Sequence, residues 1–488
     1  MDRVINAVAQ VAKNRGEPCY LVGGSIRDIL LNRDLMIQDL DFVTKEDPGD
    51  FAESLLETLQ GKLIPMDKEK RLYRIRLEEG LILDFTQIEG DGIESDLEKR
   101  DFTISAMAYP LEAPWPMEKE YIIDPFGGQR DIEKRRIRHI REEAFQEDPL
   151  RLIRAPRFMC QLRFNMGEET IEAIRKHSHL LKNVAGERIT HELFLILRED
   201  KTYHFLTFMD KKLNILNKIF PEIEDMRDIG ECKYHVVDSW THSVYTVKVA
   251  ESVIYAQGYF EDHIRQAYEE HAKELISGTH RRIDLIKLGA LFHDIGKPSA
   301  KKVDPTGRTR FRGHEITGAE LVKEYAERLK WSKKESALLY KYVAQHMTPL
   351  VLYKKNDVSG RALYQFFSAA GKETLDLLLI ALADIVSTRK LLDPHEEMGM
   401  FKIHVEYIAN NYITRYKPIE DITGIITGQE IMETVNLPES TFVGEVLEDL
   451  KKAMFYGHIS SHKEGALKYL KKNYPVKEQQ GHWKKEKQ

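Results

Sequence analysis

Cysteine is scarce in this chain, which has only Cys19, Cys160 and Cys232 among its 488 residues. Three cysteines are too few for the disulfide framework of a small secreted domain, and they argue against a cysteine-based zinc site. The opening residues, MDRVINAVAQ, lack the basic and apolar segments of a signal peptide. We therefore expect a cytoplasmic protein.

Long hydrophobic runs and an excess of one charge are missing as well. The longest uncharged apolar run covers residues 377–383, far short of the roughly 20 residues that span a membrane, so no membrane association is expected. Lys and Arg number 73 against 79 Asp and Glu, a formal charge of −6 that does not by itself indicate a nucleic-acid-binding protein. Hydrophobic residues make up 42% of the chain, which suffices for buried cores, and the length indicates several domains.

Strand and helix patterns predict an α+β chain. Short strand patterns, interrupted by turns and a helix, fill the first part of the chain, and the periodicity after it is helical. We predict an α/β head (1–132), a helical neck (133–226), a helical domain with most of the histidines (227–395) and a helical C-terminal region (396–488). The lysine-rich end of the last region is expected to fray.

A glycine turn near the N-terminus is the first candidate site. In the segment LVGGSIRD, an apolar strand meets Gly23 and Gly24, and a helix follows with Ser25 at its cap. Glycine lets backbone amides approach phosphate oxygens closely, and a helix N-terminus favours anions. A plain strand-to-helix turn has the same pattern, so this segment alone does not decide the function.

Carboxylates in the following strand patterns favour a phosphate-binding site over a plain turn. Asp39 and Asp41 are two residues apart in the strand DLDF, so both project from one face while Leu40 points into the core. Adjacent carboxylates repel one another, and a divalent cation removes that cost. Asp84, in the strand LILDF, is available as a third oxygen ligand.

Five segments follow one another in the first half of the chain: LVGGSIRDILL, DLDF, KRDFTISAMA, DPFGGQRDI and EDPLRLIRAPRF. In this order they resemble the signature of the class II tRNA nucleotidyltransferases, the CCA-adding enzymes and bacterial poly(A) polymerases of the polymerase-beta superfamily. Because five motifs in the right order seldom coincide, the resemblance is specific. It covers roughly residues 1–225.

The resemblance implies a catalytic role for Asp39, Asp41 and Asp84, with two Mg²⁺ ions held by Asp39 and Asp41. Such ions would lower the pKa of an RNA 3′-hydroxyl and neutralise the departing pyrophosphate. The implied nucleotide-binding residues are Gly23, Gly24, Ser25, Arg27, Asp28, Arg100, Asp101, Asp148, Arg151, Arg154 and Arg157. Two positions depart from the family pattern: Lys99 replaces an arginine, and Ser105 replaces the usual asparagine.

The segment EDPLR is the most informative about nucleotide choice. Cytosine and adenine both offer an amino donor beside a ring-nitrogen acceptor, whereas uracil and guanine offer an oxygen acceptor beside a ring N–H. Asp148 can accept and Arg151 can donate, so a fixed pair selects C or A, and a mismatch costs about 1–3 kcal/mol per group. Without the head motifs, an ordinary i to i+3 ion pair on a helix would be the preferred interpretation.

A second cluster of candidate residues lies in the histidine-rich region. The segment LGALFHDIGK puts His293 and Asp294 inside an apolar helix, where burying both is costly unless they are paired or bind a metal. Together with His242 and Asp384, the pair resembles the HD-domain metal phosphohydrolases over roughly residues 235–390.

The HD resemblance implies a metal site and a hydrolytic activity. His314 and His346 stand where two-metal members of that family carry further ligands. Imidazole and carboxylate ligands together suit one or two transition-metal ions, such as Mn, Ni, Co, Fe or Zn. The implied activity is that of a phosphatase or 2′,3′-cyclic phosphodiesterase; a silent or merely structural metal site is the alternative.

Three functions stay open at this point. The chain is a tRNA nucleotidyltransferase that adds C, A or both to the tRNA 3′ end from CTP and ATP, or a poly(A) polymerase with the same head. Alternatively, the HD domain is the only enzyme and the head and neck merely bind RNA. Intact Asp39 and Asp41 argue against the last interpretation. The oligomeric state does not follow from the sequence.

The subtype is indicated by one loop. In CCA-adding members a flexible loop of variable length separates the third-carboxylate strand from the RRDFT motif, whereas only residues 87–97 intervene here. A loop this short resembles the CC-adding arrangement, because that loop helps the pocket switch from C to A.

Overall fold

The computed structural model describes residues 1–33, 38–67, 71–229, 237–392 and 395–475. They form two compact units: Met1–Glu199 with Phe205–Ile219, and Asp200–His204 with Phe220–Gln488. Among the described residues, no helix combines the length and the apolar character needed to cross a membrane.

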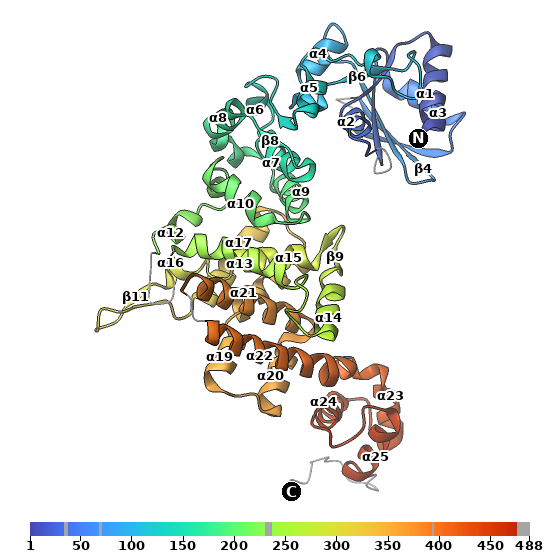
Figure 1. Cartoon of the computed structure of the whole chain (residues 1–488). Helices are drawn as coiled ribbons and strands as arrows, with labels where there is room; N and C mark the ends of the chain where they lie inside the picture. Colours follow the sequence, from blue (N-terminus) through green and yellow to red (C-terminus); the bar gives the residue numbers. More distant parts are fainter. Residues whose placement is uncertain (34–37, 68–70, 230–236, 393–394, 476–488) are drawn as a thin grey trace. The chain divides into compact units, whose positions relative to one another are not determined.

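The first unit begins with a mixed six-stranded sheet, whose order is β3-β4-β5-β2-β1-β6 (Figure 1). Only the central pair β2 and β5 is parallel. The strands are β1 (Cys19–Val22), β2 (Asp39–Thr44), β3 (Gly61–Asp67), β4 (Leu72–Leu77), β5 (Ile82–Gln87) and β6 (Ala108–Pro110). The helices of this part are α1 (Asp2–Arg15), α2 (Gly24–Leu30), α3 (Pro48–Leu56), α4 (Ile93–Glu98) and α5 (Gly128–Glu133).

Alternation along β2 gives the sheet one apolar and one partly polar face. Leu40 and Phe42 are fully buried, and the ring of Phe42 stacks on Phe85 with centroids 5.1 Å apart. Phe51 of α3 covers the same face, its centroid 5.6 Å from that of Phe85. The opposite face of β2 therefore carries Asp39 and Asp41, because successive side chains point to opposite sides.

The rest of the first unit is helical and surrounds one small parallel bridge between β7 and β8. Its elements are β7 (Arg136–Ile137), α6 (Ala144–Glu147), α7 (Arg151–Leu162), β8 (Asn165–Met166), α8 (Glu168–His177), α9 (Gly186–Leu197) and α11 (Leu216–Ile219). α10 (Thr202–Lys211) contains residues of both units. α7 packs against α9, which brings the arginine-rich start of α7 beside the start of α9.

The second unit is built from helices around the wholly buried α15. Its helices up to residue 392 are α12 (Ile223–Arg227), α13 (Ser239–Val253), α14 (Asp262–Ala272), α15 (Arg282–Phe292), α16 (Lys297–Ala300), α17 (His314–Arg328), α18 (Lys333–Gln345), α19 (Thr348–Lys355), α20 (Gly360–Ala370) and α21 (Thr374–Leu392). Two short hairpins interrupt them: β9 (Leu275–Ser277) with β10 (His280–Arg281), and β11 (Lys302–Val303) with β12 (Thr309–Arg310). α13, α18 and α21 all pack on α15.

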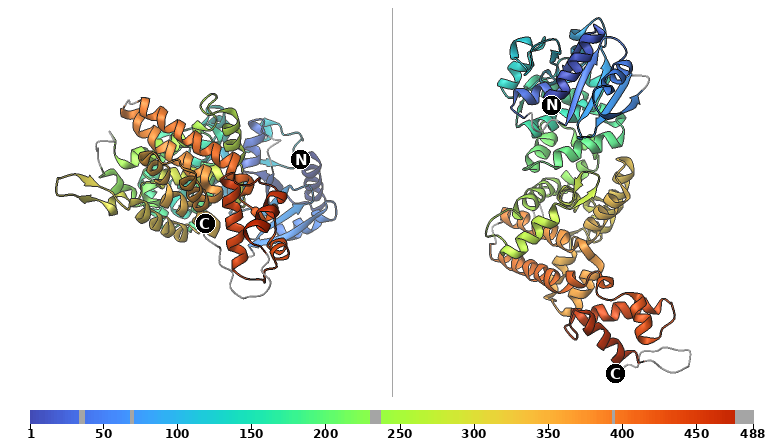
Figure 2. Two further views of the ribbon diagram at one scale, coloured as in Figure 1. Left: turned by 90° about the horizontal axis from the view of Figure 1, so that it is seen from below. Right: turned by 90° about the vertical axis from the view of Figure 1, so that its right-hand side faces the viewer.

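The C-terminal part of this unit is helical too. It comprises α22 (His395–Asn411), α23 (Gly428–Val435), α24 (Phe442–Phe455) and α25 (Lys463–Asn473) (Figure 2). α22 packs on α21. The expected fraying concerns a stretch of which residues 476–488 lie outside the described residues.

The predicted α+β class is confirmed: an α/β head precedes helical regions. Sequence analysis did not anticipate α1, β3 or β6. The four-region division stays a prediction.

Candidate functional site

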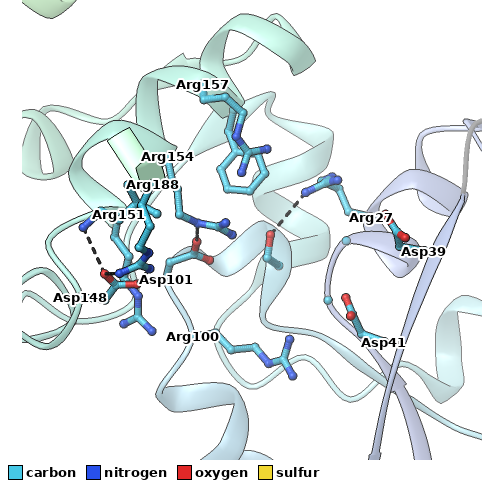
Figure 3. Close-up of a pocket in the computed structure, with 15 residues that line it drawn as sticks. Arg27, Asp39, Asp41, Arg100, Asp101, Asp148, Arg151, Arg154, Arg157 and Arg188 are labelled. Carbon is cyan, nitrogen blue, oxygen red and sulfur yellow. Dashed lines mark hydrogen bonds and ion pairs between the residues drawn. The ribbon is translucent and has the colours of Figure 1, made fainter. Parts of the chain in front are cut away.

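A pocket of about 520 Å³ lies in the first unit, between the polar face of the sheet and helices α7 and α9 (Figure 3). Most of its lining residues are charged. They are Gly23, Gly24, Arg27, Asp39, Asp41, Arg100, Asp101, Ser105, Asp148, Leu150, Arg151, Arg154, Arg157, Phe158 and Arg188. The pocket therefore collects most of the predicted nucleotide-binding residues in one place.

The glycine turn forms one wall of this pocket. Gly23 has a φ of 79°, and a Cβ there would come within 3.1 Å of Arg100 Nη1 and 3.4 Å of Asp41 Oδ2. Both facts favour glycine at this position. The expectation that Ser25 caps the helix is wrong: α2 already begins at Gly24, and the Ser25 hydroxyl donates to the Val22 carbonyl at 3.3 Å. Ser25 is not among the residues that line the pocket.

Arg27 is held in place from two sides. Its Nε and Nη2 donate to Asp28 Oδ1 and Oδ2 at 3.0 and 2.9 Å, and its Nη1 donates to Ser105 Oγ at 3.4 Å. Asp28 thus orients Arg27 rather than lining the pocket itself. Ser105, where the family usually has asparagine, accepts from Arg27 and also lines the pocket.

The strand carboxylates crowd one another as predicted. Asp41 lies opposite Asp84 in the parallel register of β2 and β5, and Asp39 is two residues away on the same face. Burial, with Asp84 and Asp39 nearby, raises the pKa of Asp41 to about 6, although Arg100 opposes the shift. A divalent cation would remove this penalty, so Asp39 and Asp41 fit the predicted ion site.

Asp84 differs from the other two carboxylates. Both of its oxygens accept hydrogen bonds at 2.7 Å from Arg74 of β4, and it does not line the pocket. Arg74 therefore neutralises Asp84, whose role as a third ligand stays a prediction.

Asp101 joins the head motif to the arginines of α7. Arg154 Nε donates to Asp101 Oδ2 at 2.7 Å, and the Phe102 amide donates to Oδ1 at 2.8 Å. Burial alone would raise the pKa of Asp101, but Arg154 and the amide hold it below its usual value. Arg100 extends past this pair and pairs with Asp96 at 3.2 Å.

The base-recognition residues adopt an arrangement that the sequence did not suggest. Asp148 and Arg151 both line the pocket, yet no ion pair joins them in the described structure. Asp148 is instead paired in bidentate fashion with Arg188 of α9, at 3.1 and 2.8 Å (Figure 3). Arg151 donates to the carbonyls of Ala144 and Lys99, at 3.3 and 2.8 Å. The alternative interpretation of this segment, an ordinary i to i+3 ion pair between Asp148 and Arg151, is therefore not what the described residues form, and the role of the two side chains in base selection stays a prediction.

Arg188 is the main residue that sequence reasoning missed. It lies 40 positions beyond Asp148, outside the five motifs. Burial alone would raise the pKa of Asp148, but the hydrogen bonds and charge of Arg188 keep it below its usual value. Asp148 thus stays an ionised acceptor with a fixed orientation.

Phe158 and Glu192 were missed as well, and they position Arg157. The guanidinium carbon of Arg157 is 3.8 Å from the centroid of the Phe158 ring, and its Nε donates to Glu192 Oε2 at 2.8 Å. Arg27 and Arg154 approach the same ring at 5.2 and 5.4 Å. Three cations thus share one aromatic side chain at the pocket wall.

The second candidate site lies in the second unit and brings all six predicted HD residues together. Two groups of donors share Asp294: one with His242 and His293, the other with His314 and His346, and the ligand atoms of each group lie within 4.8 Å of one another. Asp384 joins the first group, with Oδ1 3.0 Å from His242 Nε2.

The orientation of the imidazoles indicates a cation site. The Nδ1 atoms of His293, His314 and His346 donate to the carbonyls of Ala290, Phe311 and Val343 at 2.8, 2.8 and 2.7 Å. Each Nε2 is consequently left with a lone pair that faces inward.

The inward nitrogens lack donors to satisfy them. His314 Nε2 and His346 Nε2 are 3.3 Å apart, and the buried Nε2 of His293 has no hydrogen-bond partner among the residues that the structure describes. Burial and the neighbouring His293 and His314 together lower the pKa of His346 to about 3, so the imidazole of His346 stays neutral. Lys297 Nζ, 2.5 Å from Asp294 Oδ2, compensates one carboxylate only.

Comparisons with known proteins identify the domains in which the two candidate sites lie. Three family profiles match the chain: "Poly A polymerase head domain" over residues 19–138, "Probable RNA and SrmB- binding site of polymerase A" over 163–227, and "HD domain" over 269–389. An A-adding tRNA nucleotidyltransferase of Deinococcus radiodurans is 30% identical over 91% of this chain and 93% of its own length. The chain belongs to the tRNA nucleotidyltransferase family.

Other tRNA nucleotidyltransferases match over a similar extent. The CC-adding enzyme of Thermus thermophilus is 28% identical, covering 92% of each chain. The solved structure of the Thermotoga maritima CCA-adding enzyme with tRNA has a TM-score of 0.61 at 21% identity, covering 96% of this chain and 93% of that one. Full-length relatives thus include A-adding and CC-adding members of the family, and the structural likeness shows the fold.

The pairing of Arg188 with Asp148 generates a prediction for this tRNA nucleotidyltransferase. Arg188→Ala should lower the preference for CTP over UTP about tenfold, because a freely rotating carboxylate no longer presents its oxygens at a fixed angle. Single-nucleotide incorporation into tRNA without its CCA end measures kcat/KM for each nucleotide.

His191→Ala, at an exposed position of the same helix, is the matched control and should keep the wild-type preference. Arg188→Lys should recover part of it. Unchanged discrimination in Arg188→Ala would show that the pair has no part in base selection.

Proposed function

We propose that the chain adds nucleotides to the 3′ end of tRNA, transferring CMP from CTP with release of pyrophosphate. The observation that carries this proposal is the pocket itself, which combines a carboxylate pair suited to divalent cations with an ionised, oriented Asp148. Relatives over more than nine-tenths of the chain are tRNA nucleotidyltransferases, which favours tRNA over a poly(A) substrate.

Different residues of the pocket would have different roles in nucleotidyl transfer. Asp39 and Asp41 would hold Mg²⁺, which when bound neutralises phosphate charge and lowers the pKa of the attacking 3′-hydroxyl. Arg27, braced by Asp28 and Ser105, supplies a positive charge for the triphosphate beside the glycine turn. The chain contributes positioning and electrostatic stabilisation, which dominate such reactions.

Base selection depends on which protein groups face the hydrogen-bonding edge of the incoming base. Asp148 accepts from the amino group that cytosine and adenine share. Arg151 spends two of its five N–H donors on the Ala144 and Lys99 carbonyls, so it keeps donors for the ring nitrogen. Uracil would set its oxygen against the carboxylate and leave both groups unmatched.

The segment between β5 and Arg100 supports CC addition as the subtype. It contains the short helix α4, and it is tied to itself: the amides of Glu89 and Asp91 donate to Asp96 and Ser95 at 3.2 and 3.0 Å. A short, internally bonded segment has little freedom to reshape the pocket from C to A. Addition of A alone is the second candidate, because an A-adding enzyme matches over the same extent.

Sequencing of product ends tests this subtype. With tRNAs that end before the CCA, after C or after CC, and with all four nucleotides present, we expect products that stop at CC. Addition of A to the CC-ended tRNA would contradict the CC-adding proposal, and long A tails would establish a poly(A) polymerase.

Asp41→Asn tests the catalytic assignment. The change removes one negative charge from the ion site at nearly constant volume, so kcat for nucleotide addition should fall by about 10²–10³-fold or more. Primer extension on tRNA measures the loss. Asp50→Asn, at an exposed position of α3, should retain full activity. Wild-type incorporation by Asp41→Asn would overturn the assignment of the head.

The second unit supports a separate activity, hydrolysis of a phosphomonoester or a 2′,3′-cyclic phosphate. The support is the convergence of four inward Nε2 atoms with the buried carboxylate of Asp294 and the partly buried one of Asp384. These residues would hold one or two transition-metal ions, which when bound activate water and polarise a phosphoryl oxygen. Asp294 bridges the two groups of donors, and Lys297 stands beside it to meet a phosphate.

His293→Ala should abolish this hydrolysis and leave nucleotide addition unchanged, since the two sites lie in different units. It should also reduce bound metal and lower the thermal midpoint of unfolding with metal present, because metal affinity gained only on folding stabilises the fold. Hydrolysis of bis-p-nitrophenyl phosphate and 2′,3′-cyclic AMP across Mg, Mn, Co, Ni and Zn, with metal analysis, measures both effects.

His263→Ala, at an exposed histidine of α14, is the control for this prediction. A wild-type protein that neither hydrolyses any substrate nor binds any of these metals would leave the cluster a structural one.

A further inference from the structure

A basic hairpin interrupts the HD cluster. Between Asp294 and His314 the chain carries Lys297, Lys301, Lys302, Arg308, Arg310 and Arg312, and its acidic residue is Asp304 alone. The protein as a whole has a net charge of −6, so this run of positive charge is a local feature. Residues 301–312 form the hairpin of β11 and β12 with its flanks, hereafter the basic hairpin.

The basic hairpin extends away from the helices of its unit in two views (Figures 1 and 2). Lys302 pairs directly with Arg310 across the two strands, so their side chains share a face. Like charges in this position destabilise a hairpin. At about 3.3 Å per residue the arm is about 15 Å long, and its cations are spread along that length.

The hairpin compensates little of this charge internally. Asp304 accepts from Arg310 Nε at 2.7 Å and from Thr306 and the Arg308 amide, which shapes the turn. Within the described part of the chain, no ion pair involves the four other cations of the basic hairpin, Lys301, Lys302, Arg308 and Arg312. All four are exposed.

The base of the hairpin is joined to the metal-ligand cluster. The Phe311 carbonyl accepts the hydrogen bond from His314 Nδ1 at 2.8 Å, and the ring of Phe311 lies 5.8 Å from Lys297 Nζ. Lys297 in turn contacts Asp294. One end of a polyanion that lies along the hairpin would therefore reach the HD metal-ligand cluster.

We propose that the basic hairpin binds the phosphate backbone of an RNA strand whose terminal phosphate is the substrate of the HD cluster. This inference rests on the proposed hydrolytic function of that cluster. A mononucleotide concentrates its phosphate at one point and would leave cations along an arm of about 15 Å unused, whereas a strand carries a phosphate on every nucleotide. RNA is the polyanion that the family of this chain handles.

The test replaces the four unpaired cations in the full-length protein: Lys301→Gln, Lys302→Gln, Arg308→Gln and Arg312→Gln together. A charge-matched control replaces four exposed lysines elsewhere in the same unit: Lys333→Gln, Lys334→Gln, Lys354→Gln and Lys355→Gln. Three substrates are compared: a 12-nucleotide RNA ending in a 2′,3′-cyclic phosphate, 2′,3′-cyclic CMP and bis-p-nitrophenyl phosphate.

We expect the hairpin variant to raise KM for the RNA about tenfold, with kcat and both small substrates unchanged. The control should behave as wild type. The dependence of log affinity for the RNA on log salt should become shallower by about 3, since each lost contact to a single strand removes about 0.7.

Other outcomes overturn the proposal. An equal loss on all three substrates would show that the hairpin merely supports the cluster, and an equal loss on RNA and cyclic CMP would identify a mononucleotide site. If the wild type hydrolyses none of them, the proposed HD activity fails, and fluorescence anisotropy with the RNA still decides about the hairpin. An unchanged salt slope there refutes the proposed contact, and a shallower slope supports an RNA-binding arm without hydrolysis.

Discussion

Buried carboxylates held by a specific cation organise both sites. Asp101 is buried and stays ionised because Arg154 donates to it at 2.7 Å, and the buried Asp294 is paired in the same way with Lys297 at 2.5 Å. An isolated charge in such surroundings would neutralise or move toward water. Each carboxylate therefore determines where its partners lie, and the walls of the pocket and of the cluster follow from those pairs.

This constraint explains why Asp148 has a partner outside the recognition motif. A carboxylate that must accept from a base has to be ionised and oriented before the base arrives. Arg151 belongs to the same turn of chain as Asp148, and its guanidinium is tied to the carbonyls of Ala144 and Lys99. Arg188 comes from another helix and leaves Arg151 separate, so acceptor and donor are positioned independently.

How well the sequence predicts a site residue or a strand depends on how far apart in the chain the interacting residues are. Asp39 and Asp41 share a face because strand periodicity is local, and the pattern identified them. β3 was not predicted because Lys62, Pro65 and Asp67 obscure its alternation, so its strand state depends on pairing with β4. Arg188 was not predicted for a similar reason, because no sequence pattern near it indicates that α9 lies against α7.

The HD cluster was predictable because its candidate ligands lie in short motifs, where burying histidine and aspartate among apolar residues is costly without a metal. Its geometry was not, since the carbonyls that orient His293 and His346 come from the ends of α15 and α18, and the carbonyl that orients His314 comes from Phe311 at the base of the hairpin. Gly296 illustrates this difference: a Cβ there would lie 2.2 Å from the His314 carbonyl oxygen, a backbone clash that no local pattern reveals. Close approach of two chain segments, rather than turn geometry, requires glycine here.

The net charge of the chain does not indicate where it could bind polyanions. At −6 overall, the protein has no general attraction for nucleic acid, and both surfaces that we propose to bind phosphates are local. In the pocket the arginines donate to carboxylates or backbone carbonyls, so their positions are fixed. On the basic hairpin Arg310 is paired with Asp304, whereas the other four cations are exposed and form no ion pair with the described residues, which suits contact with a backbone regardless of sequence. One chain thus carries two kinds of positive surface, and the partners available to each cation decide which kind it becomes.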